Sequence, residues 1–262
     1  MSLRNTAPGK LSGEALNLAS TVIDRLNRGK DLSNAVVLVN KPGGFTSFDV
    51  VRLLRRVART RKVGHAGTLD PMATGLLVCM TGRSTKLSRF FLEMEKEYSG
   101  TIRLGETTAS YDADSPVDRV VDAHHVTRDA IRAVTSTFLG EIIQQTPPYS
   151  AVRVEGRPLY ERARRGDLRS GPPRVVTIHS FDIVDKRGAD VDFRMSCSKG
   201  TYVRALAHDL GEQLGVGAHL IRLHRDRIGD YCASNALTVN DLSDYAGDDP
   251  FRDLSESRDH AS

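Results

Sequence analysis

Residues 64–75 read GHAGTLDPMATG, and this stretch leads directly into the apolar run LLVCM at residues 76–80. The glycines predict a loop, and the five apolar residues after it predict a buried strand. Pro71 keeps Asp70 out of the helical conformation and holds its backbone extended. A carboxylate on such a loop either caps a turn or is presented as a reactive group. The pattern alone favours capping, because Asp in loops usually accepts hydrogen bonds from backbone amides.

The segments around this loop show a mixture of helix and strand patterns. Residues 35–40 predict a buried strand that ends in the turn KPGG, and Thr46 with Asp49 predicts the capping box of a helix reaching residue 57. Further helices are expected over residues 14–26, 85–92, 127–138, 158–165 and 202–214, and further strands over 98–104, 175–184, 191–197 and 220–228. Since these elements do not alternate in regular βαβ order, we expect an α+β domain with a mixed sheet.

The composition is that of an ordinary globular protein. Of 262 residues, 39% are hydrophobic and 27% are charged, which argues against disorder, collagen-like repeats and coiled coils. The apolar runs are too short to span a bilayer, and no secretory signal opens the chain. The cysteines Cys79, Cys197 and Cys232 are odd in number and widely spaced, which favours a reducing compartment and no zinc site. We therefore expect a soluble cytoplasmic protein.

The positive charge is concentrated outside the C-terminal tail. The net charge is +4, and the last 19 residues hold six acidic and two basic side chains. The remaining 35 basic and 27 acidic side chains suit a polyanionic partner, nucleic acid first. A basic protein without such a partner fits this composition equally well.

Several common catalytic motifs are missing from the sequence. It contains no phosphate-binding P-loop, no dinucleotide-binding GxGxxG after a strand, no HExxH metal motif and no GxSxG nucleophile elbow. Asp112 and Asp114 could open a calcium loop, but Val117 stands where that loop needs glycine, so an Asx turn is favoured. The sequence therefore indicates no metal site.

The loop at 64–75 and five further motifs resemble those of the bacterial TruB-type tRNA pseudouridine synthases. The further motifs are NKP at 40–42, KEY at 96–98, QTPPYSA at 145–151, CSKGTYVR at 197–204 and GAHL at 217–220. The resemblance covers roughly residues 35–243. It implies the pseudouridine-synthase fold, an α+β fold with a mixed, mostly antiparallel sheet flanked by helices. It also implies that the chain converts the T-loop uridine of tRNA (position 55) into pseudouridine without a cofactor or metal.

By this resemblance Asp70 is the essential catalytic aspartate. The sequence leaves open whether it attacks ribose C1′, attacks C6 of the base or takes a proton from C2′. Arg204 is its expected partner, because a planar guanidinium can hold an ionised carboxylate with two hydrogen bonds. Without the resemblance, Arg204 would be interpreted as an exposed helical arginine.

The resemblance also assigns residues to substrate binding. Tyr98 would stack on the uracil flipped out of the T loop, Tyr202 and Leu223 would line the same pocket, and His65 would fill the space that the nucleotide leaves. From the sequence alone, Tyr98 is equally a core aromatic of its strand, and His65 a loop histidine bonded to its own backbone. Lys41 is expected to bond a backbone carbonyl or to steady the loop of Asp70.

The expected organisation has three parts. An N-terminal extension spans residues 1–33, the catalytic domain 34–243 and an acidic, disordered tail 244–262, with no PUA-like C-terminal domain. Within the domain, residues 146–174 hold five of the ten prolines and seven arginines, and they resemble the mobile insertion that closes over the tRNA T-arm in this family. We expect a monomer that binds the T-arm stem-loop and no membrane.

Two other functions stay open. A guide-RNA-dependent, dyskerin-like pseudouridine synthase would use the same chemistry together with partner proteins. A non-catalytic RNA-binding or RNA-folding module would share only the basic surface.

Overall fold

The computed structural model describes residues 32–246. The strands are β1 (Val36–Lys41), β2 (Val63–His65), β3 (Thr74–Thr81), β4 (Lys96–Leu104), β5 (Glu106–Thr108), β6 (Val117–Val120), β7 (Gly140–Thr146), β8 (Arg153–Val154), β9 (Arg157–Pro158), β10 (Gly171–Arg187), β11 (Asp190–Cys197), β12 (Ala218–Ile228), β13 (Tyr231–Cys232) and β14 (Leu237–Thr238). The helices are α2 (Ser47–Val57), α3 (Ser88–Glu93), α4 (Arg128–Thr137), α5 (Leu159–Ala163), α6 (Val203–Gln213) and α7 (Val239–Ala246), with 3-10 helices η1 (Gly82–Leu87) and η2 (Ala233–Asn235).

Part of the expected organisation lies outside the described residues. This applies to the helix over 14–26 and to nearly all of the extension over 1–33 and of the tail over 244–262. Within residues 32–246, no helix has the length and apolar character needed to cross a membrane.

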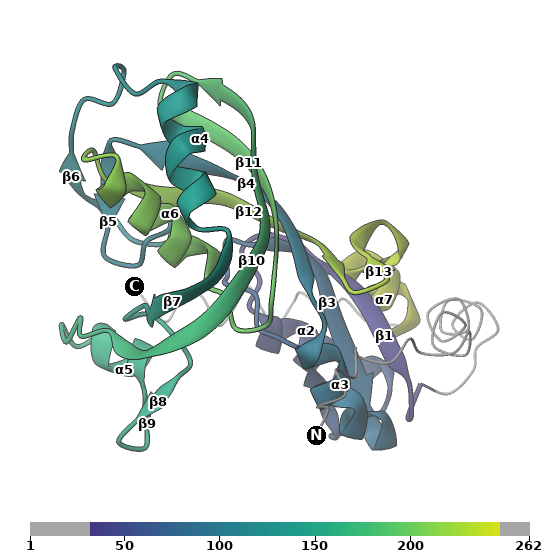
Figure 1. The fold of residues 1–262 in the computed structure, drawn as a ribbon. Helices are drawn as coiled ribbons and strands as arrows, with labels where there is room; N and C mark the ends of the chain where they lie inside the picture. Colours follow the sequence, from purple (N-terminus) through teal and green to yellow (C-terminus); the bar gives the residue numbers. More distant parts are fainter. Residues whose placement is uncertain (1–31, 247–262) are drawn as a thin grey trace, which may run out of the picture.

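A single large sheet forms the centre of the molecule (Figure 1). Its strand order is β14-β1-β3-β12-β4-β11-β10-β7, with β2 added to β3 and β13 added to β12. Only the β1–β14 and β3–β12 pairs are parallel, and all other pairs are antiparallel. The expectation of a mixed, mostly antiparallel α+β sheet is confirmed.

The first half-sheet (β14, β1, β3 and β2) is buried on both faces. Alternate residues of β1 and β3 pack with α2 and α7 on one side and with α3 on the other. Thr46 caps α2 through the expected capping box, since its side chain accepts from the Asp49 N–H while the Asp49 carboxylate accepts from the Thr46 N–H. Burial on both faces explains why these two strands are continuous apolar runs.

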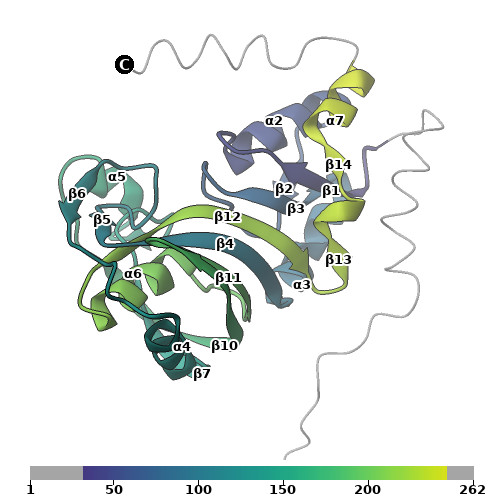
Figure 2. The same cartoon turned by 90° about the horizontal axis from the view of Figure 1, so that it is seen from above.

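The second half-sheet (β12, β4, β11, β10, β7 and β13) has one covered face. Helices α4 and α6 pack on that face (Figures 1 and 2). On β4 the residues therefore alternate, with Tyr98, Ile102 and Leu104 buried and Glu97 exposed. The alternation that predicted this strand follows from its one-sided burial.

The two half-sheets meet at the β3–β12 junction, where Thr74 and Gly75 pair with His224 and Arg225. The other end of the same edge of β3 pairs with β2. The loop of residues 66–73, which carries Asp70, connects β2 to β3. It lies between the part of β3 that pairs with β2 and the part that pairs with β12. The chain topology thus places this loop at the boundary between the half-sheets.

Several strands lie where the sequence patterns indicated none. β2 overlaps the start of the loop at 64–75, β5 and β6 follow the expected strand over 98–104, and β7 precedes the arginine-rich segment. β2 and β5 are only three residues long, and β7 begins at a glycine with φ +87° and has four polar residues that do not alternate with apolar ones. Such short or polar strands are fixed by the neighbouring strand with which they pair and give little signal in the sequence.

The arginine-rich segment leaves the sheet after β7 and returns at Gly171, which pairs with Thr146. Its first part forms the β8–β9 hairpin followed by α5 (Figure 1). Because β7 and β10 are paired, both ends of the segment are held at the edge of the sheet.

Gly75→Ala tests the close approach at the β3–β12 junction. Gly75 has φ +100°, and a Cβ there would lie 2.4 Å from the carbonyl oxygen of Arg225. We expect the free energy of unfolding, measured by chemical denaturation, to fall by about 3 kcal/mol or more, because the backbone is strained and β12 must shift. Gly188→Ala is the matched control, since Gly188 has φ +58° but no atom within 4 Å of an added Cβ. It should lose only about 1 kcal/mol, and equal losses would contradict the proposed crowding.

Candidate active site

The loop of Asp70 is held firmly from several sides. Ser47, at the start of α2, accepts from the Leu69 N–H at 2.9 Å and donates its hydroxyl to the Leu69 carbonyl at 3.1 Å. The Pro71 carbonyl accepts from the Gly44 N–H at 2.8 Å, and the Asp70 carbonyl accepts from the Ala73 N–H at 3.1 Å. These bonds fix the loop backbone on both sides of the carboxylate.

Lys41 supports the same loop from beneath the surface. Its side chain is fully buried, and Nζ donates to the carbonyls of Pro42 (3.0 Å), Phe45 (2.6 Å) and Pro71 (3.2 Å). Burial lowers the pKa of Lys41 to about 8. Lys41 thus makes the backbone contact expected from the sequence and steadies the loop next to Asp70.

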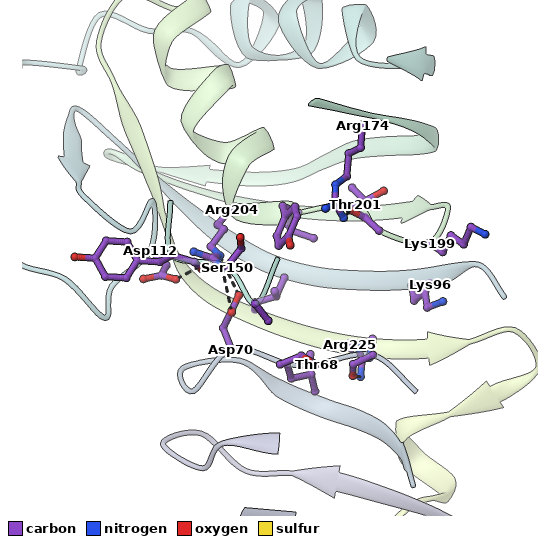
Figure 3. A pocket seen from close by; sticks show the side chains of 18 of the residues that line it. Thr68, Asp70, Lys96, Asp112, Ser150, Arg174, Lys199, Thr201, Arg204 and Arg225 are labelled. Atoms are coloured by element: carbon purple, nitrogen blue, oxygen red, sulfur yellow. Dashed lines mark hydrogen bonds and ion pairs between the residues drawn. The ribbon is translucent and has the colours of Figure 1, made fainter. Parts of the chain in front are cut away.

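Arg204 stands opposite Asp70, in the first turn of α6. Its Nε lies 3.1 Å from Asp70 Oδ2, and its Nη2 donates to Asp70 Oδ1 at 3.4 Å (Figure 3). The Arg204 side chain is 4% exposed, whereas that of Asp70 is 34% exposed. The guanidinium is therefore a buried fixture, and the carboxylate that it holds still reaches solvent.

Arg204 has two other hydrogen-bond acceptors and a second ion-pair partner. Nη1 donates to the Ser110 carbonyl at 3.1 Å, Nη2 donates to the Tyr149 carbonyl, and Nε lies 3.8 Å from Asp112 Oδ2. Burial raises the pKa of Asp112, while a hydrogen bond from Ser110 and the charge of Arg204 oppose that rise. Asp112 Oδ1 also accepts from the Asp114 N–H at 3.1 Å, which is the Asx turn favoured by the sequence.

A cavity of about 1140 Å³ opens in front of this ion pair (Figure 3). Five of the seven residues proposed from the sequence line it: Asp70, Tyr98, Tyr202, Arg204 and Leu223. They come from the 66–73 loop, β4, α6 with its N-cap residue, and β12, so the cavity spans both half-sheets. The volume is large enough for a nucleoside-sized ligand.

Tyr98 and Leu223 lie on neighbouring strands at the wall of the cavity. Tyr98 is 8% exposed and is paired in register with Arg225, whose guanidinium is hydrogen-bonded to the Tyr98 side chain. Burial raises the pKa of Tyr98, so the phenol stays neutral at ordinary pH. Arg225 also donates to the carbonyls of Leu76 (2.7 Å) and Gly67 (3.0 Å), which ties β12 to β3 and to the loop of Asp70.

Tyr202 is held through its backbone and its ring. The Gln144 side chain donates to the Tyr202 carbonyl at 3.0 Å and accepts from the Tyr202 N–H at 2.8 Å. The guanidinium carbons of Arg174 and Arg204 lie 4.9 and 5.7 Å from the centre of the Tyr202 ring. Both the aromatic face and the start of α6 are thereby fixed beside the cavity.

His65 and Lys41 do not line the cavity. His65 is the last residue of β2, and its pKa is lowered by burial and by the charge of Arg225. Its Nδ1 is buried without a hydrogen-bond partner among the described residues. The structure therefore brings His65 near the loop of Asp70 but not into the pocket formed by the other five residues.

The cavity combines four acidic residues, Asp70, Glu93, Asp112 and Asp114, with six basic ones. Its basic lining residues are Lys96, Arg164, Arg174, Lys199, Arg204 and Arg225. Burial lowers the pKa of Lys96 to about 8. Such a site can hold a polyanion at its rim, place an aromatic base against Tyr98 and Tyr202, and present Asp70 as a nucleophile or base.

Three residues of the site were not assigned from the sequence. Asp112 was recognised only as a turn residue, and Gln144 lies in a strand that was not expected. Arg225 falls two residues after Leu223 in an expected strand, so the two side chains share a face. The sequence did offer one signal that Arg225 is buried, because this charged residue lies on the same strand face as the apolar Leu223.

Comparisons with known proteins identify relatives of this chain. The profile described as TruB family pseudouridylate synthase (N terminal domain) matches residues 55–203, and that of the tRNA pseudouridylate synthase B C-terminal domain matches residues 204–254. A tRNA pseudouridine synthase B from Opitutus terrae is 44% identical over 79% of this chain and 86% of its own length. The protein of that name from Streptomyces avermitilis is 47% identical over 80% of this chain and 73% of its own length.

Solved structures show a similar fold. A Cbf5-Nop10-Gar1 complex contains a chain with a TM-score of 0.62 and 30% identity, covering 84% of this chain. The archaeal box H/ACA sRNP Nop10-Cbf5 complex gives a TM-score of 0.60, also at 30% identity. The present chain spans 56–57% of the length of these two neighbours.

Arg204→Lys tests whether the buried guanidinium organises the site. A lysine has no planar fork and cannot serve the Ser110 and Tyr149 carbonyls and Asp70 together. We expect the free energy of unfolding, from chemical denaturation, to fall by about 2–4 kcal/mol. Arg222→Lys is the control, because Arg222 is 73% exposed and lies 3.9 Å from Asp192. It should change stability by less than about 0.5 kcal/mol, and a loss at Arg204 as small as this would argue against such a role.

Proposed function

The chain belongs to the TruB family of pseudouridylate synthases, and from this premise we propose that it isomerises the T-loop uridine of tRNA, position 55, to pseudouridine through Asp70. Relatives named tRNA pseudouridine synthase B, 44–47% identical over most of the chain, support tRNA as the substrate. We assign the reaction to residues 34–243 acting as a monomer. A tRNA substrate also favours the cytoplasmic location that the cysteines suggest.

The contact between Asp70 and Arg204 is the observation that carries the proposal. A carboxylate that must react has to be held where the substrate arrives, and the buried guanidinium of Arg204 lies 3.1 Å from it. At 34% exposure the Asp70 side chain can still reach a substrate in the cavity. The bonds to its loop backbone keep the carboxylate in place, so little reorganisation is needed when the substrate arrives.

The isomerisation exchanges one bond for another within the same nucleotide. The bond from ribose C1′ to N1 of uracil breaks, the base turns in place, and C1′ bonds to C5. The C5 proton is released and N1 gains a proton, so no oxidant, reductant or second substrate is needed. The residues of the chain need only extract the nucleotide, hold the free base and supply a reactive carboxylate.

The walls of the cavity suit a base that has left its stack. Unstacking a base costs a few kcal/mol, and stacking on an aromatic ring returns about 1–3 kcal/mol. Tyr98 and Tyr202 supply aromatic surface and Leu223 supplies an apolar contact, all within the same cavity. His65 lies outside the cavity. We therefore assign it not to the pocket but to the space that the flipped nucleotide leaves in the T loop.

The structural likeness to Cbf5 keeps a guide-RNA-dependent function as the second candidate. The neighbours with TM-scores of 0.60 and 0.62 come from complexes that contain Nop10 or Nop10 with Gar1. The higher identity to the relatives named tRNA pseudouridine synthase B favours the tRNA-directed function. Activity on a bare transcript distinguishes the two, because a guide-dependent enzyme is inactive without its RNA and partners.

We expect the purified chain to convert one T-loop uridine in a T-arm stem-loop transcript, and Asp70→Asn to abolish that conversion. The loss should be at least about 10³-fold, since the amide is neither a base nor a nucleophile of comparable strength. Binding of the stem-loop should change by less than about threefold, because the phosphate contacts remain. Pseudouridine is mapped by reverse transcription after carbodiimide treatment.

Asp182→Asn is the matched control for this experiment. Asp182 is an exposed aspartate of β10 that does not line the cavity, so its variant should keep wild-type turnover. Full activity of Asp70→Asn would refute the role of Asp70. An inactive wild-type chain that still binds the stem-loop would favour the RNA-binding module instead.

We expect the arginines of the β8–α5 segment to bind RNA phosphates. Arg157 and Arg165 belong to a cluster with Arg162 and Arg169. Of these four arginines, Arg162 and Arg169 form ion pairs with acidic residues of the described chain, and Arg157 and Arg165 do not. Replacing Arg157 and Arg165 with Gln should reduce the slope of log Kd against log salt by about one to two, at about 0.7–0.9 per phosphate contact. The value of kcat should not change.

The control replaces Arg132 and Arg187 with Gln. Arg132 lies on α4, which is well separated from α5 in Figure 1, and Arg187 is the last residue of β10. This pair removes the same charge and should leave the salt slope near that of the wild type. Identical slopes for the two double variants would exclude a phosphate-binding role for the segment.

A further inference from the structure

Tyr111 lies between two contacts of Arg204 and has an unusual backbone conformation. Its φ is +66°, in the left-handed region that costs free energy for a residue with a Cβ. Within residues 32–246, Arg59 and Glu155 are the other non-glycine residues with positive φ, and neither is next in sequence to a residue that contacts Arg204. Strain of this kind persists only where the surrounding structure enforces it.

The left-handed turn brings both neighbours of Tyr111 to the same guanidinium. The Ser110 carbonyl accepts from Arg204 Nη1, and the Asp112 carboxylate lies 3.8 Å from Arg204 Nε. The backbone of Tyr111 is fixed on both sides, because its N–H donates to the Thr108 carbonyl (3.1 Å) and its carbonyl accepts from the Leu220 N–H of β12 (3.0 Å). A change in φ at this residue would move at least one of the two acceptors away from Arg204.

The Tyr111 side chain binds the helix that carries Arg204. Its ring stacks on His208 with centroids 3.9 Å apart and planes 11° from parallel. His208 follows Arg204 by four residues in α6, so both side chains project from the same face of the helix. The Nδ1 atom of His208 is buried without a hydrogen-bond partner among the described residues, so no hydrogen bond at this atom fixes the ring.

We propose that Tyr111 is a positioning residue for the reaction, which by stacking on His208 locks residues 110–112 against α6 and so fixes the guanidinium that holds Asp70. Tyr111 does not touch the substrate in this role, and its hydroxyl is not needed. The stacking contact stabilises a backbone conformation that would otherwise relax, and relaxation would release Asp112 and the Ser110 carbonyl from Arg204. The inference rests on the proposed function, because the carboxylate thus fixed is Asp70.

The experiment compares kcat and KM of Tyr111 variants on the T-arm stem-loop, using tritium released from C5-labelled uridine. Tyr111→Phe keeps the stacked ring and should retain wild-type kcat. Tyr111→Ala and His208→Ala each remove the stack and should lower kcat about tenfold while KM stays within about twofold. The double variant should be no slower than the slower single variant, because both lose the same contact.

Tyr111→Gly separates the ring from the backbone. Glycine adopts φ +66° without strain, so it should recover the melting temperature lost in Tyr111→Ala but not the lost kcat. Arg59→Ala is the control, since Arg59 is an exposed left-handed residue away from the cavity, and its kcat should not change.

Three results would overturn the inference: wild-type kcat in Tyr111→Ala, recovery of kcat in Tyr111→Gly, or additive losses in the double variant. A failure of the proposed function looks different. It would appear as an inactive wild type or a fully active Asp70→Asn variant, whereas failure of this inference alone leaves wild type active and Asp70→Asn inactive.

Discussion

A buried guanidinium must have its donors satisfied, because a buried donor left unpaired costs about 1–3 kcal/mol and more when it is charged. Arg204 meets this constraint at Nη1 and Nη2, with acceptors from three separate segments: the carboxylate of Asp70, the carbonyl of Ser110 near Asp112, and the carbonyl of Tyr149. Its Nε makes no hydrogen bond among the described residues, but it lies 3.1 Å from Asp70 Oδ2 as an ion pair. None of these segments could move far without exposing the charge to an apolar interior. One side chain of α6 therefore sets the relative positions of the loop that carries the carboxylate, the turn at residues 110–114 and the start of the arginine-rich segment.

A second arginine has the corresponding role at the β3–β12 junction. Arg225 is 2% exposed and bonds β3 through Leu76, the Asp70 loop through Gly67, and β4 through Tyr98. Gly75 allows the two backbones to come this close. In Figure 3, Arg204 faces Asp70 and Arg225 lies beside Thr68, and both arginines line the cavity. The positive charge that holds the loop is thus also available to an anionic substrate.

Sequence patterns predicted the elements that form the core of the fold. The runs in β1 and β3 are apolar because both faces are buried, and the capping box of α2 is a local contact that needs no other part of the chain. β2 and β7 were missed because their pairing partners, rather than their own residues, define them. The site residues Asp70 and Arg204 were assigned by resemblance, since 134 residues separate them and no periodicity connects them. Arg225 and Gln144 were missed because the burial of a polar side chain depends on acceptors or donors from distant segments.

The β3–β12 junction is only two residue pairs long, yet the carboxylate and its arginine come from opposite sides of it. Asp70 belongs to the loop that enters β3, and Arg204 belongs to the helix that packs on β12. Local separation at such a short join would pull the two groups apart while each half kept its own core. Contact between the carboxylate and its arginine therefore depends on a join of only two residue pairs. On gradual warming, the ability to turn over substrate would disappear before the bulk of the secondary structure melts.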